Sequence, residues 1–264
     1  MIETAEILKF LECPPSKPGI RHLNRLINAY VRKVPWESVF RIVKRASTPD
    51  RSQCPRWPDE FWQDAFYAGG GGTCFESNYA FFHLLQELGY RGYLTVNDMG
   101  EQRACHAAIV IHLDGRKVLV DVAIPIIVTL LIDPARITRR STWLHTYTAR
   151  PDGLNRYQIL RSRHPKPNIY TLHDTPVSDA DYCQILEQDY GEKGLFLNWV
   201  IIVKVIGDRL WRFSSTDLPY RLESLGQEGK QEISLSSDQV FSVLAERFRM
   251  DQAKIETAMQ SLCL

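Results

Sequence analysis

The chain has 264 residues, of which 44% are hydrophobic and 24% are charged, as in an ordinary folded globular protein. Its formal net charge of +1 creates no strong field of one sign, and no basic cluster interleaved with aromatic residues is apparent. Composition therefore argues against disordered, fibrous and nucleic-acid-binding proteins, while an enzyme fits.

The six cysteines have no short paired spacings, and acidic residues in the N-terminal stretch MIETAEILKF argue against a signal peptide. We therefore expect free thiols and a cytoplasmic protein. The longest apolar run, residues 118–132, is interrupted by Asp121 and Pro125 and is too short to span a bilayer. No membrane partner is therefore expected. No histidine has metal-ligand spacing, so no metal is expected either.

The first part of the chain has helical apolar spacing, most clearly at Leu23, Leu26 and Ile27. A later helix is predicted to begin near Cys74 and to end at Gly89, which would cap its C-terminus. We expect a helical domain over residues 1–92.

β-branched and alternating segments follow, and they predict strands at 93–96, 107–113, 117–122 and 157–160. The stretch 161–176 contains three prolines among polar residues and is interpreted as a long connection. These strands are assigned to a β domain over residues 93–195.

The remaining residues, 196–264, alternate between strand and helix signals. Two strands, 199–206 and 209–214, are predicted to form a hairpin at Gly207-Asp208, and residues 237–262 have helical spacing. The predicted fold class is therefore α+β.

Cys74 is the first candidate for chemistry. It follows the run Gly69–Gly72 and Thr73, which we interpret as a flexible, open loop entering a helix, where amide groups and the helix dipole favour a thiolate. The alternative is a small buried hydrophobic residue, the commoner fate of cysteine. A phosphate-binding loop is disfavoured because no Gly-Lys-Ser/Thr ending follows the glycines.

His106 and Asp121 are the candidate base and its orienting acid. With Asp114-Gly115 as a two-residue hairpin turn, paired positions sum to 229, so Asp121 faces Ala108 and His106 lies diagonal to it on one face. A His–Asp hydrogen bond of the kind that orients a catalytic imidazole is therefore predicted.

Other readings of this hairpin remain open. A three-residue turn would shift the register and put the two groups on opposite faces. His112 shares the predicted face but would pair with Lys117, which cannot orient a base, and Cys105 points away from His106. A lone histidine at a strand end is also often structural.

These residues resemble the arylamine N-acetyltransferase family. Residues 71–78 (GGTCFESN) are similar to its R-G-G-x-C-x-E-x-N signature, and residues 34–39 (VPWESV) to its V-P-F-E-N-L. His106 and the later segment 120–122 (VDV) resemble the histidine and aspartate of its triad, and residues 196–198 (FLN) resemble an F-x-x-N element. The signatures occur in the family's order over nearly the whole chain.

The resemblance implies an N-terminal helical bundle, a β-barrel-like middle and a C-terminal α/β lid around a cysteine-protease-like core. It implies Cys74, His106 and Asp121 as the triad, acetylated by acetyl-CoA as co-substrate, and no metal. An aromatic amine or hydrazine would then take the acetyl group in a ping-pong cycle. Trp36, Ile124 and Phe196 would contact this acceptor; the residues that bind coenzyme A are not indicated, and a monomer or a homodimer is expected.

Two departures from the family pattern leave alternatives for the substrate. The signature arginine is replaced by Gly70, and residues 121–125 (DVAIP) replace D-V-G-F-G, which changes how backbone can approach a ligand there. Alternatives are therefore an amide synthase or acyltransferase using another acyl thioester, a thiol hydrolase, and a catalytically silent homologue.

Overall fold

Helices make up most of the N-terminal third of the chain. The computed structural model describes residues 2–124, 126–192 and 194–262, so that Pro125 and Cys263 lie outside it. The helices here are α1 (Thr4–Phe10), α2 (Ile20–Lys33), α3 (Val39–Ser47), η1 (Arg51–Gln53), α4 (Pro58–Ala68) and α5 (Cys74–Glu87). The predicted apolar face of α2 is buried, and Gly89 follows the end of α5 with φ 83°, as expected of a cap.

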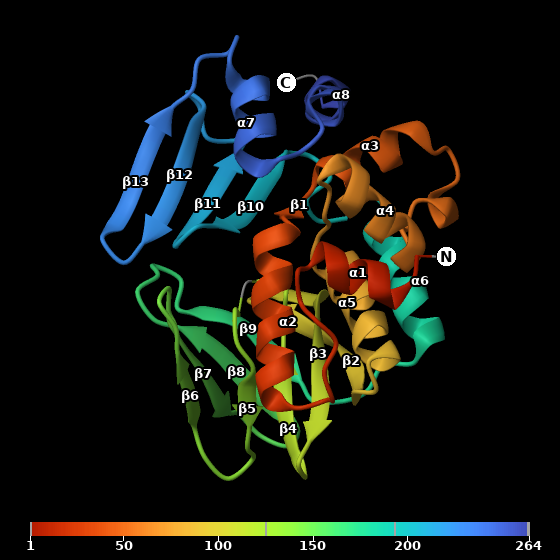
Figure 1. Ribbon diagram of the computed structural model, residues 1–264, viewed down its shortest axis with the longest axis vertical. Helices are drawn as coiled ribbons and strands as arrows, with labels where there is room; N and C mark the ends of the chain where they lie inside the picture. Colours follow the sequence, from red (N-terminus) through yellow and green to blue (C-terminus); the bar gives the residue numbers. More distant parts are fainter. Residues whose placement is uncertain (1, 125, 193, 263–264) are drawn as a thin grey trace.

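An eight-stranded antiparallel sheet forms the middle of the protein (Figure 1). Its strands are β2 (Arg91–Met99), β3 (Gln102–Leu113), β4 (Arg116–Val120), β5 (Leu130–Ile132), β6 (Thr138–Ser141), β7 (Thr146–Pro151), β8 (Arg156–Arg161) and β9 (Asn168–His173). Their order is β5-β4-β3-β2-β9-β8-β7-β6. The Thr138 hydroxyl on β6 donates to the Leu131 carbonyl on β5, so the sheet curls into a nearly closed barrel.

The interpretation of residues 161–176 as a long connection was wrong. Strand β9 lies within this stretch and pairs with both β8 and β2, through Ile159↔Tyr170 and Asp98↔Thr171. Pro165 and Pro167 occupy only the loop before it, so they do not interrupt its hydrogen bonds.

The C-terminal part of the chain adds a second sheet and a helix pair. The sheet has the order β1-β10-β11-β12-β13, with β1 (Trp36–Glu37), β10 (Ile201–Ile206), β11 (Arg209–Ser214), β12 (Arg221–Gly226) and β13 (Gly229–Ser234). The hairpin at Gly207 is confirmed. The predicted helical end is two helices, α7 (Val240–Phe248) and α8 (Gln252–Ser261), because Arg249 adopts φ 55° and Asp251 caps a new start.

Because β1 pairs with β10, the two ends of the chain share this second sheet. One more helix, α6 (Asp179–Asp189), returns to the N-terminal helices, where the Tyr182 hydroxyl donates to the Phe75 carbonyl at 2.7 Å. The division at residues 92/93 and 195/196 remains a prediction. None of the described helices is both long and apolar enough to cross a membrane.

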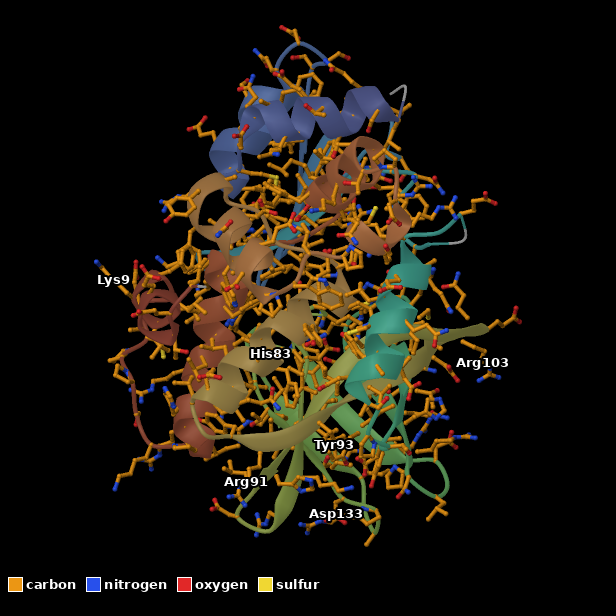
Figure 2. The ribbon with its side chains drawn as sticks, turned by 90° about the vertical axis from the view of Figure 1, so that its right-hand side faces the viewer. Lys9, His83, Arg91, Tyr93, Arg103 and Asp133 are labelled. Atoms are coloured by element: carbon orange, nitrogen blue, oxygen red, sulfur yellow. The ribbon has the colours of Figure 1, made fainter. Side chains whose placement is uncertain are left out.

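The barrel has two distinct ends. Figure 2 shows Arg91, Tyr93 and Asp133 at one end, whereas Arg103 extends from the opposite end of the β2–β3 hairpin. The residues of chemical interest lie toward the Arg103 end, where β3 begins and β4 finishes.

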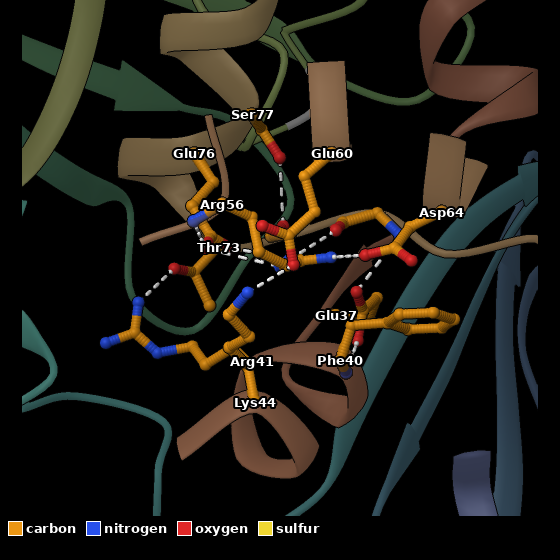
Figure 3. A network of polar contacts seen from close by, with 12 residues as sticks. Glu37, Phe40, Arg41, Lys44, Arg56, Glu60, Asp64, Thr73, Glu76 and Ser77 are labelled. Atoms are coloured by element: carbon orange, nitrogen blue, oxygen red, sulfur yellow. Dashed lines mark hydrogen bonds and ion pairs between the residues drawn. The ribbon is translucent and has the colours of Figure 1, made fainter. Parts of the chain in front are cut away.

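A buried ionic network holds the glycine run that precedes α5 (Figure 3). Arg56 Nη2 lies 2.6 Å from Glu76 Oε2 and 2.7 Å from the Gly71 carbonyl, and its Nη1 lies 2.9 Å from Asp64 Oδ2. The Glu37 carboxylate accepts from the backbone N–H groups of Gly71 and Phe40, each at 3.0 Å. The run is therefore clamped from two sides.

The expectation of a flexible, open glycine loop was wrong. A Cβ at Gly71 would lie 1.8 Å from the Pro35 carbonyl oxygen, and one at Gly70 would lie 2.9 Å from the Phe40 ring. The glycines are needed because neighbouring groups approach the backbone closely. No arginine side chain fits at position 70, and the guanidinium of this loop comes from Arg56.

We expect Arg56→Met to lower the free energy of unfolding by about 3–5 kcal/mol, because Glu76 would be left charged and buried without its partner. Urea unfolding measures this change. The matched control is Arg51→Met, whose exposed ion pair with Glu192 is 3.6 Å long and should contribute less than about 1 kcal/mol. Equal effects of the two substitutions would contradict this role for Arg56.

Candidate active site

Cys74 occupies the first position of α5. Thr73 precedes it with extended backbone, and the helix begins with the Ser77 N–H donating to the Thr73 carbonyl at 3.0 Å. The thiol of Cys74 is directed toward β3, where it contacts the Cys105 carbonyl at 3.7 Å, and the residue is 5% exposed. The free N–H groups of the first helical turn favour negative charge at this sulfur.

His106 and Asp121 meet as the hairpin register predicts. Asp114 and Gly115 both have positive φ, and Val110 pairs with Leu119, which confirms the two-residue turn. The ladder ends just before Asp121, whose Oδ2 lies 2.7 Å from Nε2 of His106. Since Nε2 is engaged by the carboxylate, Nδ1 is the imidazole nitrogen left for a second partner.

The second oxygen of Asp121 is held by donors from two directions. Its Oδ1 accepts from the backbone N–H groups of Ala123 at 3.1 Å and Ile124 at 3.2 Å, and from Asn78 Nδ2 at 3.2 Å. Asn78 also donates to the Ala107 carbonyl at 2.8 Å and accepts from Val122 N–H at 3.2 Å. Asn78 therefore ties α5 to the barrel.

The groups around His106 favour its protonated form. Burial lowers the pKa of His106, but the Asp121 carboxylate and the Cys74 sulfur raise it, for a final value of about 10. The Tyr170 ring on β9 packs on the His106 ring, with the two ring centroids 4.4 Å apart. The arrangement therefore stabilises an imidazolium between a carboxylate and the cysteine.

The rival residues lie elsewhere. His112 pairs with Lys117 toward the opposite end of the barrel, as expected. The Cys105 thiol contacts the Gln102 carbonyl at 3.5 Å and is half-buried. Among the described residues, no hydrogen bond joins either side chain to the side chains of His106 and Asp121.

Two of the three predicted acceptor residues lie together. The rings of Trp36 and Phe196 meet edge to face with their centroids 4.9 Å apart, and Trp36 forms a β-bridge with Gly72, just before the start of α5. A cavity of about 10 Å³ lies between Trp36 and Val122, with room for about one water. Ile124 differs, because its side chain packs against the barrel core.

A larger cavity of about 530 Å³ lies away from Cys74, beside the start of α2 and the strands β4–β6, and its lining includes Arg116, Arg139 and Arg140. Within the described part of the chain, no group of three or more histidine, cysteine, aspartate and glutamate side chains is placed to hold a metal ion.

Solved structures share this fold. Arylamine N-acetyltransferase from Mycobacterium marinum is 16% identical, with a TM-score of 0.82, and the match covers 99% of this chain and 100% of that one. The Salmonella typhimurium enzyme is 14% identical with a TM-score of 0.80, covering 98% of each chain. A Bacillus cereus enzyme with a Cys-His-Glu triad is 15% identical with a TM-score of 0.76, covering 95% of this chain and 100% of its own.

Among curated protein sequences, none matches the chain significantly. A family model described as N-acetyltransferase matches residues 19–256, which is most of the chain. The chain therefore belongs to the N-acetyltransferase family, and its resemblance to arylamine N-acetyltransferases is confirmed.

Proposed function

We propose that the protein transfers an acetyl group from acetyl-CoA to the nitrogen of an aromatic amine or hydrazine through a thioester on Cys74. The observation that carries this proposal is the 2.7 Å contact between His106 and Asp121 beside a cysteine at a helix N-terminus. Support for the donor comes from the fold: the Mycobacterium marinum enzyme with the same fold, at 17% identity, has been solved in complex with CoA.

In the first half-reaction the Cys74 thiolate attacks the carbonyl carbon of the acetyl thioester. A new C–S bond forms to Cys74, the bond to the sulfur of coenzyme A breaks, and the His106 imidazolium gives its proton to that leaving thiolate. Asp121 stabilises the cation before this transfer and fixes the imidazole orientation.

In the second half-reaction the amine nitrogen attacks the Cys74 thioester. His106, now neutral, accepts the proton lost by the nitrogen, the C–S bond breaks, and the Cys74 thiolate returns beside an imidazolium. The Trp36 and Phe196 rings offer an aromatic surface next to the glycine run for this acceptor.

The burial of the thiol favours acetyl over longer acyl groups. Cys74 is 5% exposed, so a long acyl chain on its sulfur would have to displace packed side chains. We also assign the enzyme to the cytoplasm, because each cysteine in the part of the chain that the structure describes has a free thiol (Cys13, Cys54, Cys74, Cys105 and Cys183).

Initial rates measured while acetyl-CoA and an aromatic amine are both varied should give parallel double-reciprocal lines, the pattern of a ping-pong cycle. Cys74→Ser should lose nearly all activity, because a hydroxyl is a far weaker nucleophile than a thiolate. Cys105→Ser is the matched control and should retain it. Intersecting lines, or loss of activity in the control alone, would contradict the proposal.

His106→Ala and Asp121→Asn should each slow acetylation of Cys74 by about 10³- to 10⁴-fold, because the first removes the base and the second removes its orientation. Stopped-flow release of coenzyme A measures this step. His112→Ala, on the same strand, should leave the rate unchanged. Combining the two damaging changes should add little, since the groups act as a unit; near-normal rates in either single variant would refute the roles assigned.

Trp36→Ala should raise KM for an aromatic amine about three- to tenfold, because one aromatic face of the acceptor site is lost, while release of coenzyme A in the first half-reaction stays near normal. Trp57→Ala serves as the control, since that ring packs on Tyr79 away from Phe196. An unchanged KM in Trp36→Ala would show that the acceptor binds elsewhere.

A further inference from the structure

The barrel strands carry an excess of basic residues. Between residues 134 and 173 the sequence has eight arginines and lysines but a single acid, Asp152. That acid pairs with Arg156 at 2.8 Å, on the turn between β7 and β8. It is therefore unavailable to the basic residues at the opposite ends of those strands.

Three of these basic residues, Arg161, Arg163 and Lys166, lie where β8 ends and the loop to β9 begins. Among the described residues, none of the three has an ion-pair partner. We call them, together with His145 and His164, the cationic loop cluster. Its members come from two loops, the one before β7 and the one after β8.

The two loops are fixed to each other by backbone contacts. The Thr146 N–H donates to the Ser162 hydroxyl at 2.8 Å, and the Ser162 N–H donates to the Thr146 carbonyl at 3.0 Å. The rings of His145 and His164 lie 6.4 Å apart across the same junction. The two loops are therefore held in one relative position, which brings the buried His145 and the exposed Arg163 and Lys166 to the same end of the barrel.

Arg161 is the central member. It faces Tyr147, which is 1% exposed, across the β7–β8 ladder, and its Nε is buried without a hydrogen-bond partner among the described residues. Burial lowers its pKa, and only Tyr147 opposes this effect. A partly buried guanidinium with an unused donor and no acid is costly to keep unless an anion completes it.

His145 adds a second buried nitrogen without a partner. The residue is 4% exposed and its Nδ1 has no partner within the described chain. Burial lowers the pKa of His145, Arg161, His164 and Arg163 lower it further, and a hydrogen bond to the Ser162 backbone opposes them, for a value of about 4. The imidazole is thus neutral at pH 7 and adds no charge repulsion, and in the tautomer with its proton on Nδ1 it can donate to an anion.

The cluster lies at the catalytic end of the barrel. Arg161 is two residues beyond Ile159, whose ladder partner Tyr170 packs on His106, a rise of about 7 Å along the strand. Tyr147 lies within electrostatic reach of both Arg161 and Asp121. Figure 1 shows this end of β7, β8 and β9 directed toward the sheet of β10–β13.

We propose that the cationic loop cluster binds the phosphate groups of the acyl-CoA donor, with Arg161 as their main charged contact. This inference rests on the proposed function, which requires a donor whose thioester and phosphates occupy opposite ends of a long flexible arm. A cationic site near the triad but separate from it has the position such a donor needs, and arginine is suited to phosphate oxygens through paired hydrogen bonds.

The kinetic test compares acetyl-CoA with S-acetyl-N-acetylcysteamine, an acetyl thioester without phosphates. Arg161→Met should lower kcat/KM for acetyl-CoA relative to the phosphate-free donor by about ten- to a hundredfold, the loss expected for a charged hydrogen bond. Arg161→Lys should recover part of it. Arg150→Met is the matched control, since that residue bonds to Gln158 nearer the other end of the same sheet. A fall that is equal for both donors would overturn the proposal.

A binding measurement separates this inference from the proposed function. Adenosine 3′,5′-bisphosphate carries phosphates of the donor but no thioester, so calorimetric titration reports the phosphate site even if no acetyl transfer occurs. We expect the wild-type protein to bind this compound and Arg161→Met to bind it at least tenfold more weakly. If Arg161→Met folds poorly, the exposed-loop variant Arg163→Met should show the same loss. No binding to the wild type, or equal binding to all variants, would overturn the inference.

Discussion

The geometry of the candidate active site depends on the Asp121 carboxylate, whose two oxygens bind different partners. One oxygen of Asp121 binds the His106 imidazole, while the other accepts from two backbone N–H groups and from Asn78. With both oxygens engaged, the carboxylate cannot rotate, so the imidazole is held in one orientation. Asn78 and Cys74 belong to the same helix, so the contact that fixes the Asp121 carboxylate also fixes Cys74 against the barrel.

The chain before Cys74 is fixed by buried charge. Glu37 and Arg56 hold the backbone of Gly71, and Arg56 in turn neutralises Glu76 in the first turn of α5. Such a network is costly to bury and adds little net stability. The network instead fixes the position of the start of α5, because these buried charged groups are satisfied in only one arrangement. The glycines have no side chain, so the backbone fits between the neighbouring groups.

Local signals in the sequence predicted much of this site. The Asp114-Gly115 turn fixes the register of its hairpin without help from the rest of the fold, so the meeting of His106 and Asp121 could be derived in advance. The glycine loop could not, because its rigidity comes from Pro35, Glu37 and Arg56, which are distant in sequence. The side chain of Ile124 packs against residues of several barrel strands, so its position could not be predicted from the sequence around it.

The strand at 168–173 and the cationic loop cluster were missed for related reasons. Pro165 and Pro167 dominate the local signal around β9, although they lie outside its ladder. The net charge of +1 hides a segment with a strong local excess of base, which matters only once β7 and β8 bring its members to one end of the barrel. Both features arise from pairing between strands, whereas sequence patterns report best on neighbours along the chain.

The most direct test is to locate the acetyl group on the enzyme. After brief exposure to acetyl-CoA without acceptor, acid quenching and peptide mapping by mass spectrometry should find one acetyl group on the peptide containing Cys74, and hydroxylamine or an aromatic amine should remove it. An acetyl group found on Cys105 or on a lysine in place of Cys74, or no enzyme-bound acetyl group with transfer still occurring, would contradict the account.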